Sequence, residues 1–255
     1  MIRELGVFFA ALRFFTRLPV PSWVGHSQQQ LEQAARYLPL VGAIVGGIGA
    51  LVTVAVAHQL PTSLAILAGM AATLLVTGAF HEDGLADAAD GFGGGRDKGH
   101  ALEIMKDSRI GSFGAIAITM MLLAKFNALA RIEALDGRQV LAFALVAGHA
   151  LSRFGSTTLI YALDYARADD SAKARPLTRR LSGAELAVAA LFGLTPCLLL
   201  AALKVWVAIA LAAGVTLLSA TYFVRRIGGY TGDCLGATQQ VAELAFYVGL
   251  LCVSS

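Results

Sequence analysis

The chain has 255 residues, of which 57% are hydrophobic and only 15% are charged, and its mean hydropathy is +0.69. A soluble domain of this length would not stay in solution with such a composition, so we expect an integral membrane protein. The formal net charge of +3 is too small to indicate a nucleic-acid partner.

Residues 1–37 predict an amphipathic N-terminal segment. Leu5, Phe8 and Leu12 recur at helical spacing. The apolar run is short, is followed by Arg13 and lacks a small-residue cleavage site, so it does not have the pattern of a signal peptide. We expect it to remain in the mature protein and to lie in the membrane interface or re-enter the bilayer.

Seven apolar stretches have about the 20 residues needed to cross the hydrocarbon core of a bilayer. They are residues 38–57, 61–80, 110–129, 139–163, 184–203, 205–224 and 238–253. The last contains Glu243 and stops almost at the C-terminus, so six spans remain an alternative. The sequence therefore predicts an all-α fold, a polytopic transmembrane helix bundle in which residues 1–255 form a single membrane domain.

The basic residues predict which loops face the cytoplasm, because positively charged loops stay inside. With the N-terminus inside, fifteen of the twenty Lys and Arg residues fall on the inner side. They are Arg3, Arg13, Arg17, Arg36, Arg96, Lys98, Lys106, Arg109, Arg167, Lys173, Arg175, Arg179, Arg180, Arg225 and Arg226. The outer side holds only Arg131, Arg138 and Lys204. Residues 81–109 and 225–238 are therefore expected to be cytoplasmic loops.

The second apolar stretch leads without a charge into an acidic row, which consists of Glu82, Asp83, Asp87 and Asp90. If the helix continues through this row, Asp83, Asp87 and Asp90 lie within roughly 60° of one another. Like charges packed this closely repel strongly, so such a row is expected where a cation or a phosphate-bound metal neutralises it. The row therefore predicts a metal site.

The rest of the first loop offers phosphate-binding groups. Its candidates are Gly93, Gly94, Gly95, Lys106, Asp107 and Arg109. Three consecutive glycines free the backbone to turn sharply and to bring N–H groups close to a phosphate. Metal ligands, backbone donors and cations in one loop are what a pyrophosphate with its divalent ion requires.

The second loop leads into the final helix, an arrangement suited to anion binding at a helix N-terminus. Its candidate residues are Arg225, Thr231, Gly232 and Asp233. Asp233 either belongs to the site or is the N-cap of the helix. Arg225 either contacts substrate or anchors the chain at the membrane.

The polar residues inside the predicted spans include Lys125, His149, Arg153 and Glu243. Such groups are expected to face the bundle interior and to pair with one another or with loop charges. Lys125 lies near the outer end of its span, so we expect its ammonium group to reach the interface.

Three motifs closely resemble the cobalamin synthase family of adenosylcobinamide-GDP ribazoletransferases: HEDGLADAADGF at 81–92, IMKDSRIG at 104–111 and GYTGDCLG at 229–236. FTRLPVP at 15–21 and LPLVG at 38–42 are also similar, so the resemblance covers nearly the whole chain. It implies a Mg²⁺-dependent, multi-pass enzyme of the inner membrane whose active site faces the cytoplasm. The substrates would be adenosylcobinamide-GDP and α-ribazole or its 5′-phosphate.

The resemblance and the residue chemistry together predict a phosphoryl transfer. A ribose hydroxyl attacks the phosphoryl group bound to cobinamide and GMP leaves, while cations stabilise the charge on the phosphoryl oxygens. The predicted metal ligands are Glu82, Asp83, Asp87 and Asp90. The predicted catalytic residues are Asp83, Lys106, Asp107, Arg109 and Asp233. The predicted substrate-binding residues are Gly93, Gly94, Gly95, Arg225, Thr231 and Gly232. Beyond the substrates, the implied partners are membrane lipid, a second copy of the chain and other enzymes of the cobalamin pathway.

Two other functions remain open. Asp87-x-x-Asp90-Gly91 also resembles the opening of the motif of CDP-alcohol phosphotransferases, a metal-dependent family with a helical membrane core, which implies a distant relation. No Ala-Arg pair follows Gly91, however, and only Asp107 is available for the later aspartate pair. A divalent-cation transporter would need carboxylates near the bilayer midplane and matching broken helices in two halves. Here the acids gather at one face, beside Lys and Arg.

Overall fold

The structure is a computed structural model that describes residues 2–25, 28–167, 179–200 and 202–252. These ranges contain helices and no strand. The one β-type contact recorded in them is an isolated parallel bridge between Tyr165 and Tyr230. The prediction of an all-α helix bundle is confirmed.

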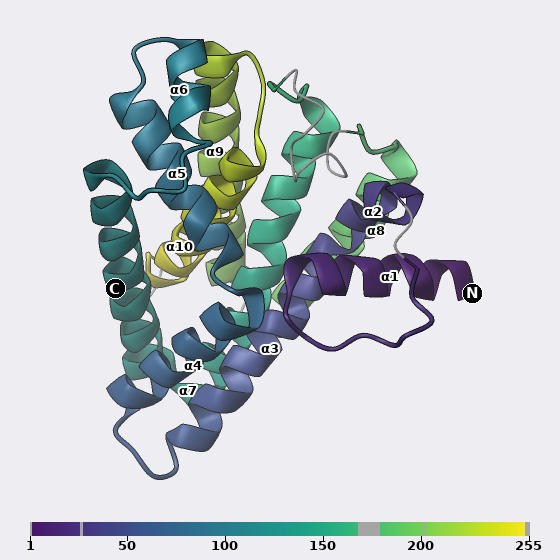
Figure 1. Cartoon of the computed structure of the whole chain (residues 1–255). Helices are drawn as coiled ribbons and strands as arrows, with labels where there is room; N and C mark the ends of the chain where they lie inside the picture. The colour runs from purple at the N-terminus through teal and green to yellow at the C-terminus, as the bar shows by residue number, and fades with distance from the viewer. Residues whose placement is uncertain (1, 26–27, 168–178, 201, 253–255) are drawn as a thin grey trace.

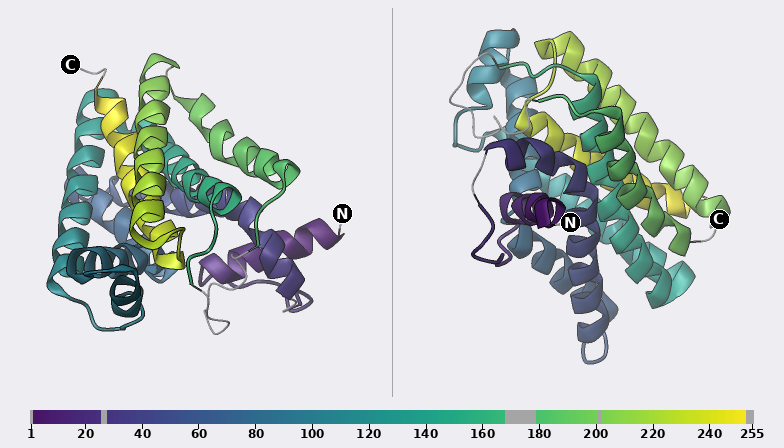
Figure 2. Two further views of the ribbon diagram at one scale, coloured as in Figure 1. Left: turned by 90° about the horizontal axis from the view of Figure 1, so that it is seen from above. Right: turned by 90° about the vertical axis from the view of Figure 1, so that its right-hand side faces the viewer.

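The N-terminal segment contains α1 (Ile2–Phe15), α2 (Gln28–Ala34) and the 3-10 helix η1 (Ala35–Tyr37). Figures 1 and 2 show α1 lying across the longer helices rather than along them. Its buried face includes Val7, Ala11, Leu12 and Phe15, whereas Leu5, the first residue of the predicted apolar spacing, is exposed.

The next part of the chain contains α3 (Leu38–Val56), α4 (Thr62–Thr77), α5 (Phe80–Gly94) and α6 (Lys98–Ile104). The expectation that one helix runs on into the acidic row is wrong, because α4 and α5 bend by 85° at their junction. Gly78 and Ala79 both adopt left-handed backbone conformations, and their N–H groups both bond to the carbonyl of Leu74. This is the usual way of ending a helix at glycine. Residues 81–109, predicted as a loop, are mostly helical.

The long helix α7 (Ser112–Ala162) contains two of the predicted spans. Its 51 residues would measure about 76 Å if straight, more than twice the hydrocarbon core. Gly137 interrupts it with φ 84° and ψ 172°. Lys125 before the break and His149 after it both reach the carboxylate of Glu243, so the two halves run side by side.

The chain closes with α8 (Gly183–Leu194), the 3-10 helix η3 (Thr195–Leu199), α9 (Ala202–Ile227) and α10 (Gly232–Leu251). Stretch 184–203 was predicted as one span, but α8 ends after twelve residues, before Pro196. Stretch 238–253 is the weakest of the predicted spans. In the structure, α10 packs between α5, α7 and α9 and is largely buried by protein. Its predicted end at Val253 lies outside the described residues.

By length and hydropathy, three described helices can each cross a membrane: Gln30–Val56, Ser112–Ala162 and Leu203–Ile227. The bent pair α4 and α5 would be a fourth if it forms one span. Fewer than the seven predicted spans meet this criterion of length and hydropathy. The reason is that α8 is short, α10 carries polar side chains and α7 counts as one helix despite its break.

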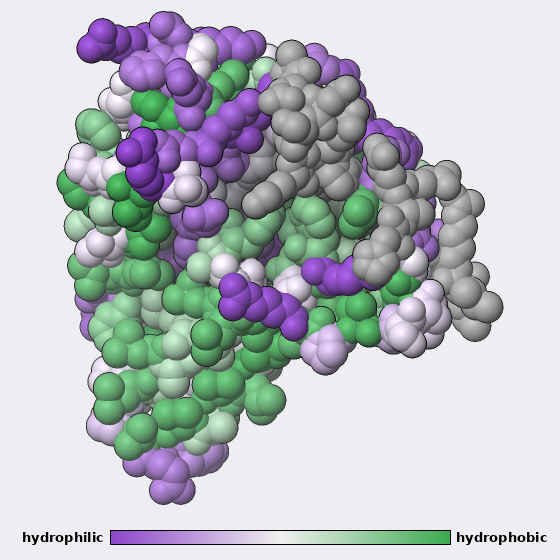
Figure 3. Space-filling view, in the orientation of Figure 1, coloured by the Kyte–Doolittle hydropathy of each residue, from purple (hydrophilic) through white to green (hydrophobic). Residues whose placement is uncertain are grey.

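The outer surface supports a membrane location. Leu75, Trp206 and Leu218 are each about 70% exposed, as expected for side chains that face lipid rather than water. In Figure 3 the hydrophilic side chains gather at the end that carries α6, and the lower part of this face is mostly apolar down to the tip formed by the α3–α4 connection.

Lys204, predicted to be outside, and Arg226, predicted to be inside, lie near opposite ends of α9. Lys204 pairs with Asp136, both from segments predicted to be outside. Arg226 donates to the carbonyl of Gly95 at 3.0 Å, which joins the two segments predicted to be inside. The predicted inner residues Lys173 and Arg175 lie outside the described residues.

Candidate functional site

Two glycines bring the acidic row against the start of α10. A Cβ added at Gly84 of α5 would lie 3.2 Å from the Cα of Asp233. A Cβ added at Gly236 of α10 would lie 3.0 Å from the carbonyl oxygen of His81. Helices cross this closely only where side chains are absent. The two predicted motifs, 150 residues apart in the sequence, therefore meet at one crossing.

Three carboxyl groups gather at this crossing, outside the apolar spans: Asp83, Asp87 and Asp233. Asp83 is exposed, while Asp87 and Asp233 are half-buried. Burial and the nearby charges of Asp233 and Asp83 raise the pKa of Asp87 to about 7. Burial also raises the pKa of Asp233, although Arg167 opposes that shift.

Arg167 is a site residue that sequence reasoning missed. Its Nη2 lies 2.7 Å from Asp233 Oδ2. No motif pointed to it, because 66 residues separate the two partners. The bridge between Tyr165 and Tyr230 places it, since the amide of Ala166 donates to the carbonyl of Tyr230 at 2.8 Å.

Thr231, not Asp233, caps α10. The Thr231 hydroxyl accepts the backbone N–H of Cys234 at 3.2 Å, which is the usual role of an N-cap. Gly232 is the first residue of the helix. The alternative that Asp233 is the N-cap is therefore wrong. Its carboxylate instead pairs with Arg167 and lies close to the carboxyl groups of α5.

Asp90, a predicted metal ligand, holds the start of α7. Its two carboxylate oxygens accept the backbone N–H groups of Gly111 at 2.7 Å and Gly114 at 2.9 Å. Both are among the first N–H groups of a helix, which have no partner within the helix. A Cβ at either glycine would lie 2.4 Å from a carboxylate oxygen of Asp90. The structure thus gives Asp90 a structural role.

Glu82, another predicted ligand, turns into the bundle. Its Oε1 accepts a hydrogen bond from Gln240 Nε2 at 2.8 Å. Its Oε2 is buried and has no hydrogen-bond partner in the structure. The structure therefore separates Glu82 from the three carboxyl groups at the crossing.

Glu82 joins an interior network whose centre is Glu243. Glu243 oxygens lie 2.9 Å from Lys125 Nζ, 2.5 Å from Gln239 Nε2, 3.2 Å from the Tyr247 hydroxyl and 3.5 Å from His149 Nδ1. Arg153 Nη1 lies 3.0 Å from His149 Nδ1. The expected pairing inside the bundle is confirmed. The expectation that Lys125 reaches the interface is wrong, because Glu243 and Gln240 bind its ammonium group.

The predicted phosphate-binding turn at Gly93, Gly94 and Gly95 is also wrong. Gly93 and Gly94 are the last residues of α5, and the Gly95 N–H bonds to the carbonyl of Gly91 at 2.9 Å. N–H groups used within a helix cannot bind a phosphate. A Cβ at Gly93 would lie 2.5 Å from the Phe113 ring, so this glycine permits close packing.

The remaining candidates lie on the surface around this end of the fold. Lys106 and Arg109 are exposed on the connection from α6 to α7, and Arg225 is exposed on the last turn of α9. Arg109 Nη2 lies 2.6 Å from Asp107 Oδ2 and holds the pKa of that carboxyl down at about 2. A carboxyl group with so low a pKa is a weak proton acceptor.

The donors at the crossing fit Mg²⁺. In the described part of the chain, no three His, Cys, Asp or Glu side chains are arranged to hold one metal ion. Mg²⁺ does not need such a cage, since it usually binds one or two carboxylates together with substrate phosphates and water. Asp83, Asp87 and Asp233 offer hard oxygen ligands, and burial together with the charges of Asp233 and Asp83 raises the pKa of Asp87.

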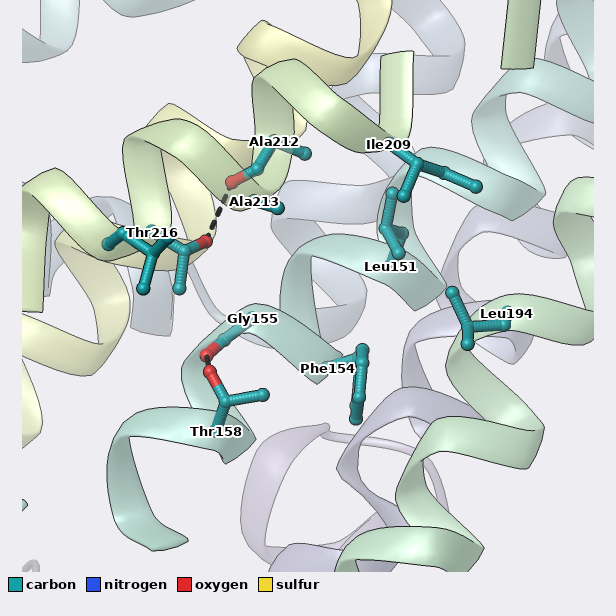
Figure 4. A pocket seen from close by; sticks show the side chains of 10 residues that line it. Leu151, Phe154, Gly155, Thr158, Leu194, Ile209, Ala212, Ala213 and Thr216 are labelled. Atoms are coloured by element: carbon teal, nitrogen blue, oxygen red, sulfur yellow. Dashed lines mark hydrogen bonds between the residues drawn. The ribbon is translucent and has the colours of Figure 1, made fainter. Parts of the chain in front are cut away.

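An apolar hollow of about 300 Å³ lies elsewhere, between α7, α8 and α9. Figure 4 shows Phe154, Ile209 and Thr216 among the side chains that line it. The Thr216 hydroxyl donates to the carbonyl of Ala212 on its own helix. No charged group lines this hollow, so it is not the candidate site.

Comparison with known proteins adds independent information. The family model for cobalamin-5-phosphate synthase matches residues 7–251. An adenosylcobinamide-GDP ribazoletransferase of Shewanella frigidimarina is 45% identical, with 99% of this chain and 96% of that protein aligned. Proteins of the same name from Leptothrix cholodnii and Ralstonia nicotianae are 46% and 49% identical, covering 98% and 92% of this chain and 97% and 90% of their own lengths. No solved structure matches significantly, so the expected distant relation to CDP-alcohol phosphotransferases stays a prediction.

Proposed function

The chain belongs to the cobalamin-5-phosphate synthase family, and on that premise we propose that it is a Mg²⁺-dependent membrane enzyme. It transfers the phosphoryl-cobinamide part of adenosylcobinamide-GDP to α-ribazole or its 5′-phosphate and releases GMP. The observation that carries the site is the meeting of Asp83 and Asp87 with Asp233 at the Gly84–Gly236 crossing. The site faces the cytoplasm of a cell whose inner membrane holds the protein.

One or two of the carboxylates of Asp83, Asp87 and Asp233 would hold the ion, together with substrate phosphate and water. When bound, it withdraws negative charge from the pyrophosphate of the nucleotide. Negative charge also builds up on the phosphoryl oxygens as the ribose hydroxyl attacks, so nearby cations lower the barrier. Arg167 lies beside Asp233 and is a partly buried phosphate ligand in this proposal.

Proton transfer and substrate binding divide among the other residues. The attacking ribose hydroxyl loses its proton as the new P–O bond forms, and the bond to the GMP phosphate breaks. Asp83 is the exposed carboxylate of the crossing and takes that proton in this proposal. Asp107 and Arg109 act as a pair on the substrate rather than as a base, and Lys106 contacts phosphate.

Product analysis tests the function directly. Purified protein in lipid vesicles should convert adenosylcobinamide-GDP, α-ribazole and Mg²⁺ into adenosylcobalamin and GMP in equal amounts, and a chelator should stop the reaction. Arg167→Met should lower turnover by about a hundredfold, because an unpaired phosphate charge is left in the site. Absence of GMP from the wild type would contradict the proposal.

Arg180→Met is the matched control for Arg167→Met. Arg180 pairs with Asp164 at 2.7 Å in the same part of the chain, but both side chains are mostly exposed. Exposed ion pairs contribute little to stability, so turnover should stay unchanged. Equal loss in both variants would mean that Arg167 acts through general structure rather than on the phosphate.

The transporter alternative has less support. Its carboxylate near the midplane would be Glu243, but Lys125 lies 2.9 Å away and neutralises it. The cavity beside this pair measures about 20 Å³, which is room for about one water molecule rather than a hydrated ion.

A further inference from the structure

Gln240 joins three helices at one buried amide. On α10 it is 2% exposed. Its Oε1 accepts from Lys125 Nζ of α7 at 2.7 Å, and its Nε2 donates to Glu82 Oε1 of α5 at 2.8 Å. An ammonium group can only donate and an ionised carboxylate can only accept, so these two neighbours fix the orientation of the amide. Gln239 Oε1 accepts from the same Nε2 at 2.7 Å.

The hydrogen bond between Glu82 and Gln240 is a directional contact where α5 crosses α10. The crossing itself is made by Gly84 and Gly236, which have no side chains to interlock and so permit sliding. Gln240 and Asp233 are seven residues apart, two turns along one face of α10. Glu82 immediately precedes Asp83 in α5. A shift at this hydrogen bond therefore moves Asp83 relative to Asp233.

We propose that Gln240 is a positioning residue that, through Glu82 and Lys125, fixes α5 against α10 so that Asp83 and Asp87 face Asp233. This inference rests on the proposed metal-dependent function. It also assigns Glu82 to positioning rather than to the metal, in contrast to the prediction from the sequence. A buried amide satisfied on both sides is suited to this role, because its hydrogen bonds hold only at one register.

Exchanging the two side chains tests the assignment. Glu82→Gln keeps an acceptor for Gln240, so the Mg²⁺ concentration at half-maximal GMP release should change by no more than about threefold. Gln240→Glu places two buried carboxylates face to face and should raise that concentration by at least about tenfold. The double variant Glu82→Gln with Gln240→Glu restores one donor and one acceptor. It should recover to within about threefold of the wild type.

Two further measurements separate positioning from general stability. Mn²⁺ binding without substrate should follow the same order of variants, and thermal unfolding should show whether each variant is folded. Thr238→Val is the matched control: Thr238 is buried on α10, and within the described residues its hydroxyl donates to the carbonyl of Cys234 in the same helix. Its Mn²⁺ affinity should match that of the wild type.

The outcomes are distinguishable. If Glu82→Gln alone abolishes metal binding and the double variant does not recover, Glu82 is a ligand and the inference is wrong, although the proposed function stands. Should Gln240→Glu fail to fold, the Glu82→Gln result still decides between the two roles. If the wild type shows no metal-dependent GMP release, the proposed function itself fails.

Discussion

At the scale of single residues, the four carboxylates of the acidic row have different partners. Asp90 binds the start of α7 and Glu82 binds Gln240, whereas Asp83 and Asp87 face Asp233. The whole row lies in α5, beyond the break at Gly78 and Ala79, so the spacing that predicts a shared face for Asp83, Asp87 and Asp90 is kept. The sequence cannot tell which carboxylates find backbone or amide donors, since those donors come from distant segments.

Asp87→Asn should stabilise the metal-free protein while abolishing turnover. The pKa of Asp87 is about 7 in the folded protein, against 3.8 for an unperturbed side chain. A raised folded-state pKa favours the protonated form, so stability is lost as the pH rises from about 4 to about 7. The gain in Tm of the variant over the wild type should therefore grow across that range in chelator and shrink with Mg²⁺.

Asp97→Asn is the control for this pH series. Asp97 caps α6 by accepting the His100 N–H at 3.0 Å, and Asn serves equally well as an N-cap. Its Tm should track the wild type at every pH. A gain for Asp87→Asn that does not vary with pH would count against the raised pKa of Asp87, whose largest cause is burial.

At the scale of elements, glycines and caps decide where the helices meet. Gly84 and Gly236 set the crossing of α5 and α10, and Gly78 ends α4 so that α5 turns away. The sequence shows that these glycines exist but not which helix approaches them. It therefore predicts the helices well and their breaks poorly, as the wrong phosphate-binding turn at Gly93–Gly95 illustrates.

Asp90→Ala should destabilise the protein by about 1–2 kcal/mol, because two N–H groups at the start of α7 lose their acceptor. Asp90→Asn keeps one acceptor oxygen and should lose roughly half as much. Denaturation monitored in detergent measures both changes. If Asp90→Ala is as stable as the wild type but has lost its affinity for Mg²⁺, Asp90 is a metal ligand and its structural role is wrong.

At the scale of the whole molecule, hydropathy and charge predict the most. An apolar composition predicts the membrane bundle, and Lys204 and Arg226, predicted on opposite sides, lie near opposite ends of α9. The number of spans is predicted less well, because α7 folds back at Gly137 and α10 is enclosed by protein. The sequence does not indicate that Arg167 belongs to the site, because the two residues come together only in the folded chain, where Arg167 pairs with Asp233.

Accessibility of single cysteines tests the topology. In a background without Cys197, Cys234 and Cys252, Gly99→Cys and Gly183→Cys should be labelled only from the cytoplasmic side. Both positions are exposed, and the new side chains meet no backbone. Gln59→Cys, in the exposed α3–α4 connection, should react from outside. Labelling of Gly99→Cys in intact cells would reverse the orientation.

Counting bound Mn²⁺ by electron paramagnetic resonance tests the central claim most directly, namely that carboxylates of α5 and α10 together hold a divalent ion. The wild type and Asp97→Asn should bind Mn²⁺ that Mg²⁺ displaces. Asp87→Asn and Asp233→Asn should each weaken binding by at least about tenfold, because each removes one charged ligand. Unchanged Mn²⁺ binding in both of these variants would contradict the account.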